Sequence, residues 1–88
     1  MPIISYFFGI VIKMYFDDHN PPHFHAEYQG REGLFHINDG RCFEGDLPDK
    51  AVKIISEWAI SRKSELMRDW ELAQGHQPLE KIKGADND

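Results

Sequence analysis

IVIKMYFDDHNPPHFHAEY, residues 10–28 of the 88-residue chain, contains two runs of alternating apolar and polar residues around a loop rich in Asp, His and Pro. This pattern is typical of two paired β-strands. Their apolar faces must match, because a one-residue slip would turn the histidines into the core. The matching register pairs Met14 with Phe24 and Ile12 with Ala26. It places Lys13 opposite His25 and Tyr15 opposite His23.

Further β signals fill the rest of the first half, where β-branched and aromatic clusters are separated by glycines. Asp39-Gly40 predicts a two-residue type I′ turn, since both central positions of that turn need positive φ. The turn would pair Ile37 with Cys42 and His36 with Phe43.

The hydrophobic period changes after Asp46, which is expected to cap a helix with Pro48 in its first turn. Apolar residues then recur at helical spacing as far as Gly75. One unbroken helix would be about 40 Å long, whereas a compact chain of this size has a radius of gyration of about 12 Å. The polar run at residues 61–64 therefore predicts a break between two helices, at about residues 48–61 and 64–74.

These elements predict an α+β fold. A small twisted antiparallel sheet of about four strands, residues 3–45, would be covered on one face by the two C-terminal helices. The chain has room for one domain, which we expect to span residues 1–82, followed by a disordered polar tail at residues 83–88.

Charge and composition limit the function. Acidic residues outnumber basic ones by 15 to 10, giving a net charge of −5, which argues against a protein that coats nucleic acid and leaves RNA only as a substrate. The lone Cys42 cannot form an internal disulfide, and no signal peptide or membrane-spanning stretch is evident. We expect a soluble cytoplasmic protein, with an exposed sheet edge available for self-association or for a partner strand.

The strongest functional signal is a histidine cluster. His19, His23 and His25 lie within seven residues, beside Asp17 and Asp18. Histidines two apart on a strand project to the same side, so their imidazoles can converge on one divalent transition metal.

The same cluster allows three interpretations. In the first, His23 and His25 bind a metal together with a third ligand, which is His19, Glu27, Asp17 or Asp18. Pro21 and Pro22 would stiffen the loop and so lower the cost of ordering it. The positive charge of Lys13 would oppose binding of a cation. In the second, His23 and His25 act as general acid and base without metal, assisted by His19. Lys13 or Arg31 would counter negative charge in the transition state, and Tyr15 lies on the same face. In the third, the histidines only build a turn by bonding loop carbonyls.

The run from Ile10 to Tyr28, followed by Glu44-Gly-Asp-Leu-Pro48 and the helical Glu57-Trp58 and Asp69-Trp70-Glu71, resembles the DUF4160 family of small bacterial proteins. The resemblance extends from about Ile3 to Leu79. It marks His19, Pro21, Pro22, His23 and His25 as the family's hallmark, without assigning them a role. Family members often look like one half of a two-gene unit with a DUF2442 protein, and these units resemble toxin–antitoxin modules.

The resemblance therefore implies a partner protein rather than a reaction. We expect an interaction component of a toxin–antitoxin-like pair, with the histidine-rich surface as its contact or active surface. The alternative is a hydrolase, with a ribonuclease as one case, that works with or without a metal through His19, His23 and His25.

Overall fold

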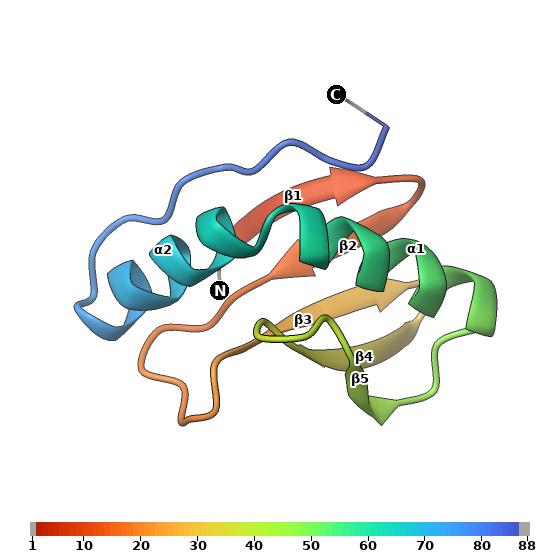
Figure 1. The fold of residues 1–88 in the computed structure, drawn as a ribbon, viewed down its shortest axis with the longest axis horizontal. Helices are drawn as coiled ribbons and strands as arrows, with labels where there is room; N and C mark the ends of the chain where they lie inside the picture. Colours follow the sequence, from red (N-terminus) through yellow and green to blue (C-terminus); the bar gives the residue numbers. More distant parts are fainter. Residues whose placement is uncertain (1, 87–88) are drawn as a thin grey trace.

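The computed structural model describes residues 2–86. An open antiparallel sheet contains five strands in sequence order: β1 (Ile3–Phe7), β2 (Ile10–Lys13), β3 (His23–Tyr28), β4 (Arg31–His36) and β5 (Cys42–Gly45). Two helices follow, α1 (Asp49–Ser61) and α2 (Lys63–Gln74), and they pack along one side of the sheet (Figure 1). The predicted α+β class is confirmed.

The sheet has five strands rather than about four because the first apolar stretch is split by a tight turn. Phe8 and Gly9 both have positive φ, 52° and 78°, and so do Gln29 and Gly30 between β3 and β4, 50° and 80°. Two consecutive residues with positive φ form the type I′ geometry whose twist matches that of the flanking strands. Each of these turns closes a hairpin.

The register predicted for β2 and β3 is confirmed where the two strands pair. Ile12 lies opposite Ala26 and Lys13 opposite His25. β2 ends at Lys13, so Tyr15 does not pair with His23 as predicted, and its ring instead stacks on His25 with centroids 4.3 Å apart.

The turn predicted at Asp39-Gly40 is wrong. Only Gly40 has positive φ, and the connection spans residues 37–41, so that Cys42 pairs with Phe35 instead of Ile37. Ile37 leaves the ladder because it is fully buried and its N–H donates to the carbonyl of Pro22 at 3.1 Å.

The start of α1 also differs from the prediction. Asp46 is not the cap: Pro48 occupies that position with no side-chain hydrogen bond, and the N–H of Asp46 donates to the Glu32 carbonyl at 3.2 Å. Leu47, between Asp46 and Pro48, is buried in the core, so the chain turns inward at this point before the helix begins. The predicted break in the polar run is confirmed, since only Arg62 separates the two helices.

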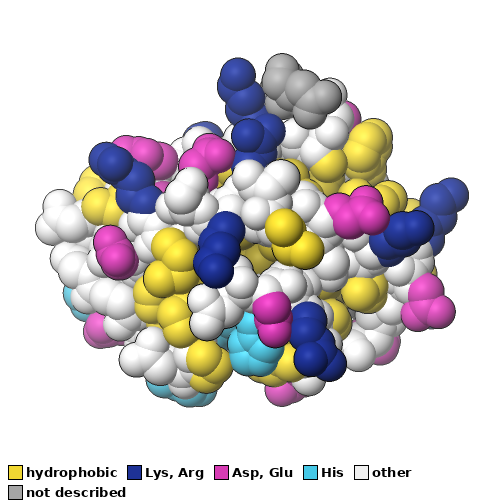
Figure 2. Space-filling model, viewed as in Figure 1, with side chains coloured by type: hydrophobic (Ala, Val, Ile, Leu, Met, Phe, Trp, Pro, Cys, Tyr) yellow, Lys and Arg dark blue, Asp and Glu magenta, His cyan; other side chains and the backbone are white. Residues whose placement is uncertain are grey.

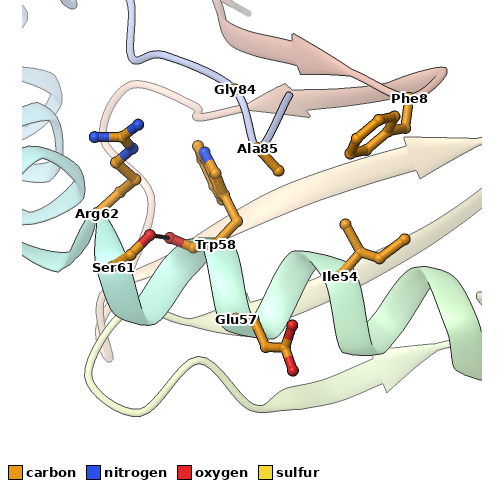
Figure 3. A pocket seen from close by; sticks show the side chains of 8 residues that line it. All are labelled: Phe8, Ile54, Glu57, Trp58, Ser61, Arg62, Gly84 and Ala85. Atoms are coloured by element: carbon orange, nitrogen blue, oxygen red, sulfur yellow. Dashed lines mark hydrogen bonds between the residues drawn. The ribbon is translucent and has the colours of Figure 1, made fainter. Parts of the chain in front are cut away.

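Residues after α2 return along β1. Ile82 donates its N–H to the Ile4 carbonyl at 2.7 Å, and the indole of Trp58 donates to the Lys83 carbonyl at 2.8 Å. Figure 3 shows Trp58 rising from α1 toward the segment that holds Gly84 and Ala85. The sequence predicted a polar tail at residues 83–88. Residues 83–86 belong to this returning segment, and residues 87–88 lie outside the described residues. Neither of the helices in residues 2–86 has the length and apolar character needed to cross a bilayer.

Candidate metal centre

Side chains on β3 alternate between the two faces of the sheet. Phe24 and Ala26 are fully buried on the helix side, whereas His25 and Glu27 belong to the opposite face. Strand pairing places Leu34 beside His25, and Glu44 beside Leu34 on the next strand. Side chains from several strands therefore adjoin the histidines.

Three metal-ligating side chains converge at the start of β3. The Nε2 atom of His23 lies 2.9 Å from Asp18 Oδ2, and the Nε2 atom of His25 lies 3.3 Å from the same oxygen. One ligand atom from each residue lies within 4.8 Å of the other two. Among residues 2–86 these three form the candidate metal-binding group, which we call the Asp18 triad.

The remaining ring nitrogens of the triad also face oxygen atoms. His23 Nδ1 lies 2.8 Å from the Pro21 carbonyl, and His25 Nδ1 lies 3.3 Å from Glu32 Oε2. A neutral imidazole has one N–H and one lone pair, so it cannot donate to two acceptors. Each ring needs either a second proton or a cation at Nε2. Metal-bound histidines typically donate their other N–H to a carbonyl or carboxylate in this way.

The two spacings between the histidine nitrogens and the Asp18 carboxylate fit a coordination sphere. Ligand atoms about 2.1 Å from a tetrahedral zinc ion lie roughly 3.4 Å from one another. The two nitrogen–oxygen distances in the triad, 2.9 and 3.3 Å, are close to this value. Two imidazoles and one carboxylate suit zinc, iron, nickel and similar divalent ions.

The C-terminal end of α2 holds the loop that carries Asp18. The Gln74 amide donates to the Asp18 carbonyl at 2.9 Å, and His76 Nε2 lies 2.9 Å from Asp17 Oδ2. The N–H of Asp17 also faces the Ala73 carbonyl at 3.4 Å. Packing of α2 on the sheet therefore positions the triad carboxylate.

Aromatic rings surround the triad histidines. Trp70 of α2 lies 5.4 Å from the His23 ring, Phe43 meets the same ring edge-on at 5.9 Å, and Tyr15 stacks on His25. The side chains of His23 and His25 are only 8% and 15% exposed. This packing fixes the orientation of both rings before any ion arrives.

The Asp18 carboxyl is held in its charged form. Burial alone would raise its pKa, but hydrogen bonds from His25 and from the His19 N–H, with the nearby imidazole charges, lower the pKa below its ordinary value. An ionised carboxylate is the form that binds a metal.

The other predicted site residues lie around the triad. His19 is 93% exposed and approaches Asp18 Oδ1 at 3.4 Å, so it stands at the rim. Glu27 forms an ion pair with Lys13 and is not among the three converging residues. This bond to Glu27 raises the pKa of Lys13 above its ordinary value, although desolvation opposes it. The positive charge of Lys13 is therefore compensated.

The two prolines and Asp17 act through the backbone or away from the triad. The peptide bond between Asn20 and Pro21 is cis, and Pro21 supplies the carbonyl that orients His23. The Pro22 carbonyl accepts the bond from Ile37, and Asp17 faces His76.

A hollow of about 300 Å³ opens over the triad. Its other lining residues come from the loop and the two last strands: His19, Asn20, Pro21, Leu34, Phe43 and Glu44. A small molecule in this hollow would contact the triad directly.

Several residues that support the triad were not predicted from the sequence. Glu32 bonds His25, and Gln74 and His76 anchor the loop. The Gln29-Gly30 turn was a usable signal for Glu32, because a two-residue hairpin there brings β4 alongside the histidines. No local signal identifies Gln74, which lies 56 positions from Asp18.

An open five-stranded meander with two helices on one face and an Asp/His triad at the start of β3 defines a small α+β protein with a candidate metal centre. The chain belongs to the DUF4160 family: residues 9–71 match the family model described as "Domain of unknown function (DUF4160)". The matched region contains the whole triad. No curated protein and no solved structure gives a match.

Proposed function

We propose that this protein binds one divalent transition metal through Asp18, His23 and His25 and uses it in hydrolysis. The observation that carries the proposal is the convergence of both Nε2 atoms on Asp18 Oδ2, while each Nδ1 already faces an oxygen acceptor. One cation in place of the two Nε2 protons satisfies every one of these groups.

Catalysis is supported by what the triad leaves open. Structural zinc sites are closed by four protein ligands, whereas catalytic ones use three and keep a position for water. The triad supplies three ligands and lies beneath a hollow of about 300 Å³. In hydrolysis, water adds its oxygen to the electrophilic carbon, the bond to the leaving group breaks, and a proton passes to solvent.

Zinc titration of the apoprotein in a calorimeter tests the metal site. We expect one zinc ion per chain. His23→Ala or His25→Ala should weaken zinc binding about 100-fold or more, because removing a ligand costs more affinity than removing a residue that only hydrogen-bonds a ligand, which costs about 10–100-fold. His36→Ala is the matched control, because His36 stacks on Phe43 in the neighbouring strand but is not one of the triad. Equal zinc binding in all of these proteins would contradict the proposed site.

Hydrolysis is tested with 4-nitrophenyl acetate as a simple ester. The zinc-loaded protein should release nitrophenolate faster than the apoprotein and faster than the double variant His23→Ala, His25→Ala treated with zinc. The zinc-loaded His36→Ala control, whose triad is intact, should keep the rate of the unmodified protein. Rates that do not depend on zinc would leave the metal site without the catalytic role.

We also propose, from the family resemblance, that the protein acts in the cytoplasm as one component of a toxin–antitoxin-like two-gene module with a DUF2442-like partner. Expression without the neighbouring gene tests this. Growth arrest that is abolished in the double variant His23→Ala, His25→Ala would support both the module and the role of the triad in toxicity. Normal growth, together with no complex on co-expression, would contradict the module.

A further inference from the structure

We infer that the metal centre selects uncharged or cationic organic ligands over phosphates, with Glu44 as the residue that sets this preference. The inference rests on the proposed metal centre and names the ligand class that it would take. It follows from the position of Glu44, from the charges that line the hollow, and from the apolar surface between Glu44 and the triad.

Strand register places Glu44 at a fixed position relative to the triad. Leu34 pairs with His25 on one side and with Glu44 on the other, so these three residues form a row across β3, β4 and β5. Neighbouring strands are about 4.8 Å apart, which puts the Glu44 backbone roughly 10 Å from that of His25. All three residues line the hollow.

The charge of Glu44 is available to a ligand. It has no ion-pair partner among residues 2–86, whereas Glu27 is engaged by Lys13 and Glu32 by His25. No lysine or arginine is found among the lining residues of the hollow within this described part of the chain.

The charge balance disfavours phosphate. A divalent ion would be offset by the carboxylates of Asp18 and Glu44 at the hollow, with Glu32 adding further negative charge behind His25. Phosphate sites in proteins typically supply arginine or lysine donors. On the helix-covered face that Figure 2 presents, lysine and arginine are scattered among acidic side chains. A nucleic-acid backbone is therefore a poor match.

The surface between the triad and Glu44 is apolar. Leu34 lies between them, and Phe43 is 43% exposed beside them. A fitting ligand presents an uncharged metal-binding group to the triad, an apolar linker to Leu34 and Phe43, and a cationic amine to Glu44.

Three imidazoles that differ only in their tails test this inference on cobalt(II)-loaded protein at pH 8, with the visible cobalt absorption as the readout. The probes are 1-(3-aminopropyl)imidazole, 1-butylimidazole and 3-(imidazol-1-yl)propanoate. We expect the amine to bind about fivefold more tightly than the butyl compound, the size of a partly exposed charge pair, and the carboxylate to bind most weakly. Inorganic phosphate should leave the spectrum unchanged at concentrations where the amine saturates.

Glu44→Gln should abolish the preference for the amine without reducing cobalt affinity. Glu57→Gln is the matched control, because Glu57 lies on α1 beside a separate hollow (Figure 3) and should keep the preference. Equal binding of the three probes, or a preference unchanged in Glu44→Gln, would overturn the inference while the metal centre stands.

Failure of cobalt to bind would overturn the metal centre itself. In that case amide NMR shifts of the apoprotein still judge the role of Glu44. Larger shifts at Phe43 and Glu44 with the amine than with the carboxylate support it, and equal shifts contradict it.

Discussion

Asp69 on α2 provides a test of how burial and charge interact in this fold. Its side chain is almost wholly buried, with the residue 1% exposed, and Oδ1 accepts the Glu80 N–H at 2.8 Å. Oδ2 is buried and has no hydrogen-bond partner among the described residues. Burial raises the pKa of this carboxyl above its ordinary value, and the nearby charges of Glu80 and Glu65 add to the effect, while the Glu80 N–H and Arg68 oppose it.

We expect Asp69→Asn to stabilise the protein at pH 7. The amide oxygen keeps the bond to the Glu80 N–H, and the charge that must be buried at neutral pH is removed. A buried polar atom left unpaired costs about 1–3 kcal/mol, and more when it is charged. The uncharged amide nitrogen that replaces Oδ2 removes only the extra cost of the charge, so a gain of about 1–2 kcal/mol is expected. For a domain of this size the melting temperature should rise by roughly 4–15 °C.

The gain should depend on pH with a definite sign. Because the folded pKa of Asp69 lies above the unfolded value of about 3.9, the native protein loses stability as the pH rises through the folded pKa. As the pH falls below about 3.9 the carboxyl becomes protonated in the unfolded state as well, so the difference in melting temperature between the two proteins should shrink. Melting curves by circular dichroism from pH 3.5 to 8 measure this, with Glu71→Gln on the exposed side of α2 as control. A variant that is less stable at pH 7, or a gain that is the same at every pH, would refute the reasoning.

Further predictions concern the loop and the sheet. Gln74→Ala removes the hydrogen bond to the Asp18 carbonyl. It should weaken zinc binding about fivefold, the equivalent of one hydrogen bond, with little change in melting temperature. Unchanged zinc affinity in calorimetry would show that α2 does not position the triad. Gly45→Ala should destabilise the fold by about 3 kcal/mol or more, because φ is +118° and the added Cβ would lie 2.3 Å from the Glu32 carbonyl oxygen. Gly30→Ala is its control, because φ at Gly30 is +80° but no atom lies within 4 Å of an added Cβ. This substitution should lower the free energy of unfolding by only about 1–2 kcal/mol in a urea titration. Equal losses in the two variants would contradict the close approach at Gly45.

The register of β2 and β3 was predictable from sequence because it depends on local alternation. Burying Ile12 and Ala26 together leaves one acceptable pairing, and the structure has it. The turn at Asp39-Gly40 was not predictable from its own residues, because Ile37 is drawn out of the ladder by the core and by the Pro22 carbonyl. The conformation of that loop is determined by contacts with residues far from it in the sequence.

The same distinction applies to the site. The spacing of His23 and His25 placed both imidazoles together, since it depends only on the two-residue period of a strand. The choice of carboxylate was open, because Asp17, Asp18 and Glu27 are all close in sequence. It depends on the path of the loop, which Gln74 fixes from the end of α2, and on Lys13, which engages Glu27.

The most direct test of the metal centre is anomalous diffraction at the zinc absorption edge from crystals grown with zinc. We expect one strong peak about 2.0–2.2 Å from His23 Nε2, His25 Nε2 and an Asp18 carboxylate oxygen. No peak between these three residues, in crystals that hold zinc elsewhere or not at all, would contradict it.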